Sequence, residues 1–410
     1  MKKIVPIIII VLIAIIVIVK LTKSDDLNSL GDRNFTKEGK LKKKPDFAKI
    51  NDTVSVRFFI ESSGSMNGFF RSDAPTEFKR DVYTIMSYYT NITKDINIMT
   101  NEGSIDRTLT LSQFQGAMNA GNLQSNASTK VPKMLTSIIE QLHKGEVAVL
   151  ISDMKYSPVG DQSPEVLLLQ YSAEIAKIAG NSKKAFGLVG ATSDYLMRTQ
   201  DTIKKSPYYY LIIGDQDRVT YIRNGISSIL DRNNNYVDNI DFGYEYGNVP
   251  YEFGNIQNVV QLENEPTFCE YLDPCTITLK VKLETYRWIV ANEKIIRNNF
   301  KCKSMHGSTV KTTIKDIEVD NYTDKELKRS VVATIELKVS NMQQDMDVIE
   351  WNLDIPSSDY TRLTQFYGAT SENDFTKSYS IETFISGIQQ GGIVNKQPNP
   401  NYILITKKNL

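Results

Sequence analysis

The hydrophobic positions in the first half of the chain follow two alternating patterns. Runs that are apolar at nearly every position predict strands covered on both faces; they occupy 54–60, 147–151, 185–189 and 208–213. The segments between them carry apolar side chains three and four residues apart, which predicts helices; these are 76–89, 131–143, 163–179 and 217–230. The alternation predicts an α/β domain over 52–232 with a doubly wound, mostly parallel sheet.

An antiparallel hairpin is expected at one edge of this sheet. The runs 96–100 and 107–111 are short and surround a turn at 101–104. Two strands joined by so short a connection pair antiparallel.

The second half of the chain has a different period. From residue 276 onward, apolar and polar positions alternate strictly, as along 277–283, 331–339 and 349–355. Strict alternation predicts strands with one buried face. We therefore expect an immunoglobulin-like antiparallel β-sandwich over 276–410, joined to the first domain by a connection over 233–275. A helix predicted at 372–389 is assigned to this β-rich domain.

The first 22 residues are strongly apolar. An uncharged run over 4–19 follows two lysines, and neither a small-residue cleavage site nor a cysteine follows it. This pattern predicts an uncleaved transmembrane helix over 1–22, followed by a flexible polar linker over 23–51. A single N-terminal anchor usually exports the rest of the chain, so we expect a single-pass membrane protein whose body lies outside the cytoplasm. Lysines on both flanks leave the orientation open.

Composition narrows the classes of function. The chain has 410 residues, with 48 basic and 48 acidic side chains and a net charge of zero. Nucleic-acid binding relies on clustered basic residues, so we expect no nucleic-acid partner. The two histidines, His143 and His306, lie in different regions, which leaves little material for a histidine-based metal site or nucleophile. Because HExxH, GxSxG and phosphate-loop motifs are also missing from the sequence, we expect no enzymatic activity.

Polar side chains follow the first apolar run directly, as Glu61-Ser62-Ser63-Gly64-Ser65. Carboxylate and hydroxyl oxygens suit Mg²⁺, Ca²⁺ or Mn²⁺, and do not suit zinc or copper. Ligands in open α/β sheets sit beyond the carboxyl ends of strands, where this loop is expected. Two further segments share that placement: Thr129 precedes a predicted helix, and Asp153 closes the run 147–151.

Together these three segments resemble the metal site of von Willebrand factor A-type domains, the integrin I-domain family. The family pattern is Asp-x-Ser-x-Ser after the first strand, a Thr in a later loop, and an Asp closing an apolar strand. The resemblance implies a magnesium site, or one for Mn²⁺ or Ca²⁺, formed by Glu61, Ser63, Ser65, Thr129 and Asp153. Ser63, Ser65 and Thr129 would be direct or near-direct ligands, and Asp153 would act directly or through water. Glu61 stands where the family has Asp, and its extra methylene leaves room for a bridging water at most.

The expected function is that of a membrane-anchored protein-binding module with a role in adhesion. A cation with an open coordination position would take an acidic side chain from a partner protein. A structural scaffold of a membrane-associated complex, with a degenerate metal site, is the alternative, and a metal-dependent hydrolase is a further one. The rim segments 69–71 and 154–156 would form the recognition surface, or else pack over the neighbouring helix.

Overall fold

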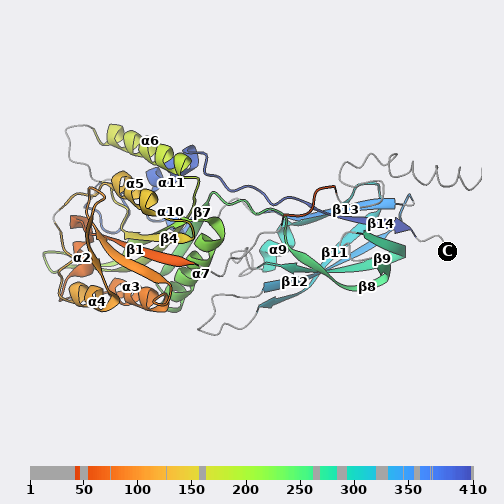
Figure 1. Cartoon of the computed structure of the whole chain (residues 1–410), viewed down its shortest axis with the longest axis horizontal. Helices are drawn as coiled ribbons and strands as arrows, with labels where there is room; N and C mark the ends of the chain where they lie inside the picture. The colour runs from red at the N-terminus through yellow and green to blue at the C-terminus, as the bar shows by residue number, and fades with distance from the viewer. Residues whose placement is uncertain are drawn as a thin grey trace, which may run out of the picture. The chain divides into compact units, whose positions relative to one another are not determined.

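The computed structural model describes two compact units. One contains residues 49–245 and 357–396, and the other contains 246–356 and 397–410 with the described part of 1–48. The β-rich unit is therefore inserted into the α/β unit, as the change of colour along the chain shows (Figure 1). The residues described are 42–46, 54–73, 75–125, 127–156, 163–261, 268–283, 293–319, 331–344, 346–354, 361–369, 371 and 373–407.

A seven-stranded mixed sheet forms the centre of the α/β unit, with strand order β3-β2-β1-β4-β6-β5-β7. β1 pairs parallel with β2 and with β4, whereas the remaining pairs are antiparallel. The strands are β1 (Ser55–Glu61), β2 (Thr93–Met99), β3 (Ile105–Leu109), β4 (Glu146–Ser152), β5 (Ala185–Leu196), β6 (Thr202–Gly214) and β7 (Tyr236–Phe242).

The predicted strands and the edge hairpin are confirmed, but the expected mostly parallel sheet is wrong. β5 and β6 form a long hairpin closed at 197–201, where Met197 N–H donates to the Asp201 carbonyl at 2.9 Å. A connection this short forces antiparallel pairing, and β6 therefore lies antiparallel between β4 and β5. An apolar run covered on both faces has the same sequence pattern in either direction. β7 lies within the segment that was expected to be a connection. Its sequence did not predict a strand, because Asp and Asn alternate with its apolar residues.

Helices cover both faces of this sheet (Figure 1). The four predicted helices are confirmed, each within a few residues of its expected bounds; they are α3 (Glu77–Tyr88), α5 (Val131–Gln141), α6 (Pro164–Ser182) and α7 (Gln216–Arg232). Local capping explains two of their starts, because Thr76 accepts from the third backbone N–H of α3 and Pro164 occupies the first turn of α6. A further helix, α4 (Leu111–Asn119), begins with a capping box of Thr110 and Gln113.

The helix near the C-terminus belongs to the α/β unit, which corrects its assignment to the β-rich domain. α11 (Ile381–Gln390) packs against α6, and its apolar side chains join the core of the large sheet. The two helices approach closely at glycines: a Cβ on Gly387 would lie 2.8 Å from the Ser172 carbonyl oxygen, and one on Gly391 would lie 2.5 Å from the Ala176 carbonyl oxygen. The predicted boundary of 276–410 is therefore wrong, because residues 357–396 return to the first unit.

The β-rich unit is antiparallel apart from one strand pair. Its hydrogen-bonded order is β10-β13-β14-β9-β12-β11, with β8 also paired to β9, and β14 pairs parallel with β9. The first part of β9 pairs with β14 and its second part with β12, so one strand joins what were expected to be two separate sandwich sheets. The strands are β8 (Tyr251–Gln261), β9 (Phe268–Lys282), β10 (Phe300–Ser304), β11 (Thr309–Val319), β12 (Val331–Ser340), β13 (Met346–Leu353) and β14 (Asn401–Lys407).

The remaining short elements are η1 (Gly64–Met66), α2 (Asn67–Phe70), α9 (Glu293–Asn299) and α10 (Thr361–Thr364). The predicted anchor at 1–22 and most of the predicted linker at 23–51 lie outside the described residues. Among the helices that are described, none has the length and apolar character needed to cross a membrane.

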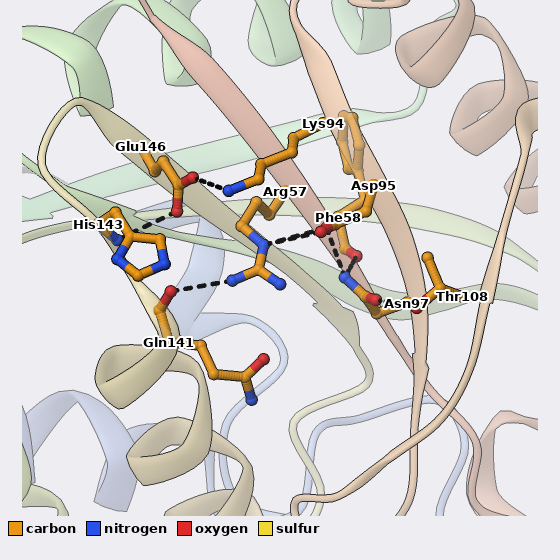
Figure 2. A network of polar contacts seen from close by, with 9 residues as sticks. All are labelled: Arg57, Phe58, Lys94, Asp95, Asn97, Thr108, Gln141, His143 and Glu146. Atoms are coloured by element: carbon orange, nitrogen blue, oxygen red, sulfur yellow. Dashed lines mark hydrogen bonds and ion pairs between the residues drawn. The ribbon is translucent and has the colours of Figure 1, made fainter.

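A polar network fixes β1, β2, β4 and α5 to one another near the amino ends of β1 and β4 (Figure 2). Arg57 Nε donates to both carboxylate oxygens of Asp95 at 3.1 and 3.0 Å, and its Nη1 donates to the Gln141 carbonyl at 2.9 Å. Asn97 Nδ2 donates to Asp95 at 2.6 Å, and Lys94 pairs with Glu146. The network holds β1 beside β4, which aligns the opposite ends of the two strands.

Candidate functional site

The aligned carboxyl ends of β1 and β4 carry the two predicted carboxylates. β1 ends at Glu61 and β4 ends at Ser152, directly before Asp153. The strands are parallel neighbours with Ile60 opposite Ile151, so both carboxylates emerge at one edge of the sheet. This placement confirms the expectation that the two loops lie at the same edge.

Glu61 is completely buried, and both of its carboxylate oxygens accept hydrogen bonds. Thr129 Oγ1 donates to Oε1 at 2.6 Å, which brings the loop before α5 to the site. The Ser152 hydroxyl donates to Oε2 and itself accepts from Met154 N–H at 2.7 Å. Ser152 was not predicted, although its place directly before Asp153 is a signal for such a role.

The two serines of the first loop lie side by side. Ser63 Oγ and Ser65 Oγ are 3.1 Å apart; Ser63 is buried and Ser65 is partly exposed. Burial raises the pKa of both site carboxyls; the Ser63 hydroxyl opposes this rise at Glu61, and the Ser65 hydroxyl opposes it at Asp153. The structure therefore brings together all five predicted site residues.

Asp153 has a buried oxygen that is not satisfied. The residue is 2% exposed, and its Oδ1 accepts from Lys155 N–H at 3.2 Å. In the described part of the chain, no hydrogen bond of good geometry reaches Oδ2. Buried carboxylate oxygens are nearly always paired, so this one marks a position where a positively charged ligand is expected.

Burial raises the pKa of both site carboxyl groups, Glu61 and Asp153. Burial raises the pKa of Glu61 to about 7, with the nearby Asp153 charge adding to the increase, while hydroxyls of Ser152, Ser63 and Thr129 oppose it. Burial also raises the pKa of Asp153, and Lys155 and Ser65 oppose that increase. Two close carboxylates in a dry site favour the uptake of positive charge.

The residues fit a hard divalent cation. Two oxygens at neighbouring positions of an octahedral Mg²⁺, each at about 2.1 Å, would lie about 3.0 Å apart, close to the separation of Ser63 and Ser65 Oγ. The Thr129 hydroxyl donates its proton to Glu61 and keeps lone pairs for a cation. The described residues contain no group of three or more His, Cys, Asp or Glu side chains suited to a metal. The site instead combines two carboxylates with hydroxyls.

The rim side chains other than Arg71 pack inward, which supports the packing interpretation for them, whereas Arg71 is half-buried. Phe69, Phe70, Met154 and Tyr156 are all buried. Phe69 stacks on Phe78 of α3 with ring centroids 5.0 Å apart. These side chains extend the core to the edge of the site.

Lys155 and Phe375 lie together beside the site, which the sequence did not indicate. Lys155 is 3% exposed, and its Nζ lies 3.8 Å from the ring centroid of Phe375. Phe375 in turn stacks on Tyr195 with centroids 4.3 Å apart. Phe375 lies so far along the chain from Asp153 that no local pattern connects them.

A pocket opens beside the first loop, with a volume of 530 Å³. Its floor includes Gly64, Asn67 and Gly68, and its walls include Tyr195 and Phe375. The pocket adjoins the loop that carries Ser63 and Ser65, so a ligand at this edge has space beside the site.

A second grouping of Ser, His and Asp side chains, in the β-rich unit, serves a turn. Ser304 Oγ donates to Asp347 at 2.6 Å, while His306 contacts Asp347 through its backbone N–H at 3.0 Å. Backbone N–H groups of Gly307 and Ser308 also donate to Ser304 Oγ. The contacts close the β10–β11 turn, and the imidazole is not placed as a base toward the serine hydroxyl.

Comparisons with known proteins do not assign the chain to a family. No protein-family model matches this sequence. No curated protein matches it significantly, and neither does any solved structure. The resemblance to A-type domains therefore rests on residues 61–65, Thr129 and Asp153 and on their meeting at one edge.

Proposed function

We propose that the chain is a membrane-anchored protein-binding module that holds Mg²⁺, or Mn²⁺ or Ca²⁺, at the edge of its large sheet. The residues that would hold it are Glu61, Ser63, Ser65, Thr129 and Asp153. The observation that carries the proposal is their convergence from separate loops around a buried Asp153 oxygen with no hydrogen-bond partner among the described residues.

The bound cation would supply positive charge and an open coordination position that a partner's carboxylate can fill. Glu61 and Asp153 provide the negative charge that retains it. The hydroxyls of Ser63, Ser65 and Thr129 provide neutral oxygens, so one coordination position can stay open for a group from outside the chain. A carboxylate of the partner protein is a hard oxygen ligand suited to that position, and the proposal includes no catalytic step.

The experiment is calorimetric titration of the full chain, purified in detergent, with Mg²⁺ and Mn²⁺. Asp153→Asn keeps the side-chain shape and removes the charge, so we expect saturable binding in the wild type and none in the variant. Asp73→Asn is the matched control, because Asp73 is exposed, pairs with Arg71 beside the same pocket and is not a site residue. Equal affinity in wild type and Asp153→Asn would refute the cation site.

A structural scaffold with a degenerate site is the second candidate. It is favoured because protein hydroxyls already donate hydrogen bonds to the Glu61 carboxylate. Both of its oxygens are satisfied by Thr129 and Ser152, and Lys155 supplies an internal positive charge near Asp153. This candidate predicts no saturable cation binding, with or without added carboxylate. The titration therefore separates the two candidates.

The membrane anchor over 1–22 is part of the proposal and rests on the apolar run in the sequence. We expect the chain to sediment with membranes and to be released only by detergent. Added protease should digest the body in intact cells, since the body is proposed to lie outside the cytoplasm. Protection of the body until the cells are lysed would reverse the proposed orientation.

A further inference from the structure

Residues 373–380 lie beside the candidate site, in contact with its neighbours. Phe375 stacks on Tyr195, and the ring of Tyr195 lies over Gly68, where an added Cβ would be 2.4 Å from ring carbon atoms. On the other side, Lys155 Nζ lies 3.8 Å from the Phe375 ring centroid. A continuous stack therefore connects the first site loop, through Phe375, to the loop after Asp153.

Lys155 interacts with carboxylates on both sides of this stack. Burial raises the pKa of Asp153, and the charge of Lys155 opposes that rise. Beside Phe375, the Thr376 hydrogen bond lowers the pKa of Asp374, and the charge of Lys155 adds to this lowering. An ammonium group over an aromatic ring is attracted to the ring face, and more strongly when it is shielded from water. Lys155 thus links the site carboxylate to residues 373–377.

The segment around Phe375 is folded on itself. Asp374 Oδ1 accepts from Thr376 N–H at 3.0 Å and from the Thr376 hydroxyl at 2.6 Å. Its far end is fixed, because Ser378 N–H donates to the Phe366 carbonyl at 3.0 Å and the Ser378 hydroxyl lies 2.7 Å from the Tyr209 hydroxyl. Residues 373–377 therefore contain a local turn, and Ser378 is fixed ahead of α11.

Four of the five site residues are buried in this arrangement, and Ser65 is partly exposed. Glu61 and Ser63 are fully buried, Thr129 is 1% exposed and Asp153 is 2% exposed. A carboxylate carried by another protein cannot reach groups so deeply covered. Engagement of a protein ligand requires the covering residues to move.

We propose that residues 373–377 form a lid latched by Lys155, and that positive charge bound at Asp153 releases it. This inference rests on the proposed function. Lys155 supplies positive charge near Asp153 in this arrangement. Once a divalent cation neutralises Asp153, like charges repel the ammonium from its place over Phe375. Phe375 then keeps only its stack on Tyr195, and the lid opens toward the adjoining pocket.

The direct test is hydrogen–deuterium exchange of the full chain in detergent, with and without saturating Mn²⁺. Backbone amides of 373–380 should exchange at least several-fold faster with Mn²⁺, whereas those of α5 should not. Unchanged or slower exchange of 373–380 in a chain that binds Mn²⁺ would overturn the lid and leave the cation site standing.

Lys155→Met tests the latch, because it keeps the length of the side chain and removes its charge. We expect about tenfold tighter Mn²⁺ binding, since a competing positive charge is removed, and fast lid exchange that no longer responds to Mn²⁺. Lys130→Met is the matched control: Lys130 follows Thr129 directly, but its ammonium pairs with Glu102. Wild-type affinity with a retained Mn²⁺ response in Lys155→Met would exclude the latch. Absence of binding in both wild type and Lys155→Met would refute the proposed function and the lid together.

Discussion

Thr129 Oγ1 donates a hydrogen bond of 2.6 Å to Glu61 Oε1, although the two residues are 68 positions apart. The contact joins the end of β1 to the loop before α5, and it uses the extra length of Glu where the A-type pattern has Asp. The longer side chain is accommodated by this hydroxyl and by Ser152.

Thr129→Val should lower the free energy of unfolding by about 1–3 kcal/mol, because it leaves a buried carboxylate oxygen without its donor while keeping the side-chain shape. Urea denaturation followed by circular dichroism measures the change. Thr84→Val serves as control, since Thr84 lies on the exposed face of α3 and its hydroxyl donates to the Arg80 backbone carbonyl. Equal stability of Thr129→Val and wild type would show that Glu61 finds another donor.

The pH dependence of stability follows from the raised pKa of Glu61. Its folded-state pKa is about 7 and its ordinary value is 4.5, so between these values the folded chain binds more protons than the unfolded chain. The contribution of Glu61 is therefore fully present below about pH 4.5 and is lost as the pH rises through 7, by at most about 3 kcal/mol.

Denaturation in EDTA at intervals from pH 5 to 8 would measure this loss, and Glu61→Gln should remove that part of the slope. A slope that is the same in Glu61→Gln and wild type would assign the pH dependence to other groups.

Gly68→Ala should destabilise the α/β unit by about 1–3 kcal/mol, because the new Cβ would meet the Tyr195 ring at 2.4 Å and force the ring to shift. It should also loosen Phe375, which stacks on the same ring. Gly116→Ala is the opposite case: nothing lies within 4 Å of its Cβ, and a helical Gly→Ala change there should stabilise by about 0.5–1 kcal/mol. Thermal melts of both variants would show whether the signs differ.

Arg57→Met should cost about 1–3 kcal/mol, because the mostly buried Asp95 carboxylate loses a bidentate partner and the Gln141 carbonyl loses a donor. Cation binding should survive wherever the variant is folded, since the network lies at the amino ends of the strands. Arg107→Met, on exposed strand β3, should change stability by less than about 0.5 kcal/mol. Loss of cation affinity in folded Arg57→Met would mean that the strand register, and not only stability, depends on this network.

The site residues could be chosen from the sequence because each has a local signature. Glu61 directly follows a run of apolar residues, Asp153 follows another after Ser152, and Thr129 stands just before a helix with Pro132 in its first turn. Strand ends and helix starts are set by near neighbours in sequence, so a single-sequence pattern places them well. Ser152 carried the same signature and was passed over.

The sequence by itself determined the positions of the α/β strands other than β7, of helices α3, α5, α6 and α7, and of three polar loops at one edge. It could do so because apolar periodicity and capping are local properties. The tertiary structure alone decided that β6 runs antiparallel beside β4, that α11 packs on α6, and that Phe375 and Lys155 cover the site. Those relations join residues separated by a hairpin or by the whole inserted β-rich unit. They depend on which surfaces can be buried against each other, and no short stretch of sequence encodes that choice.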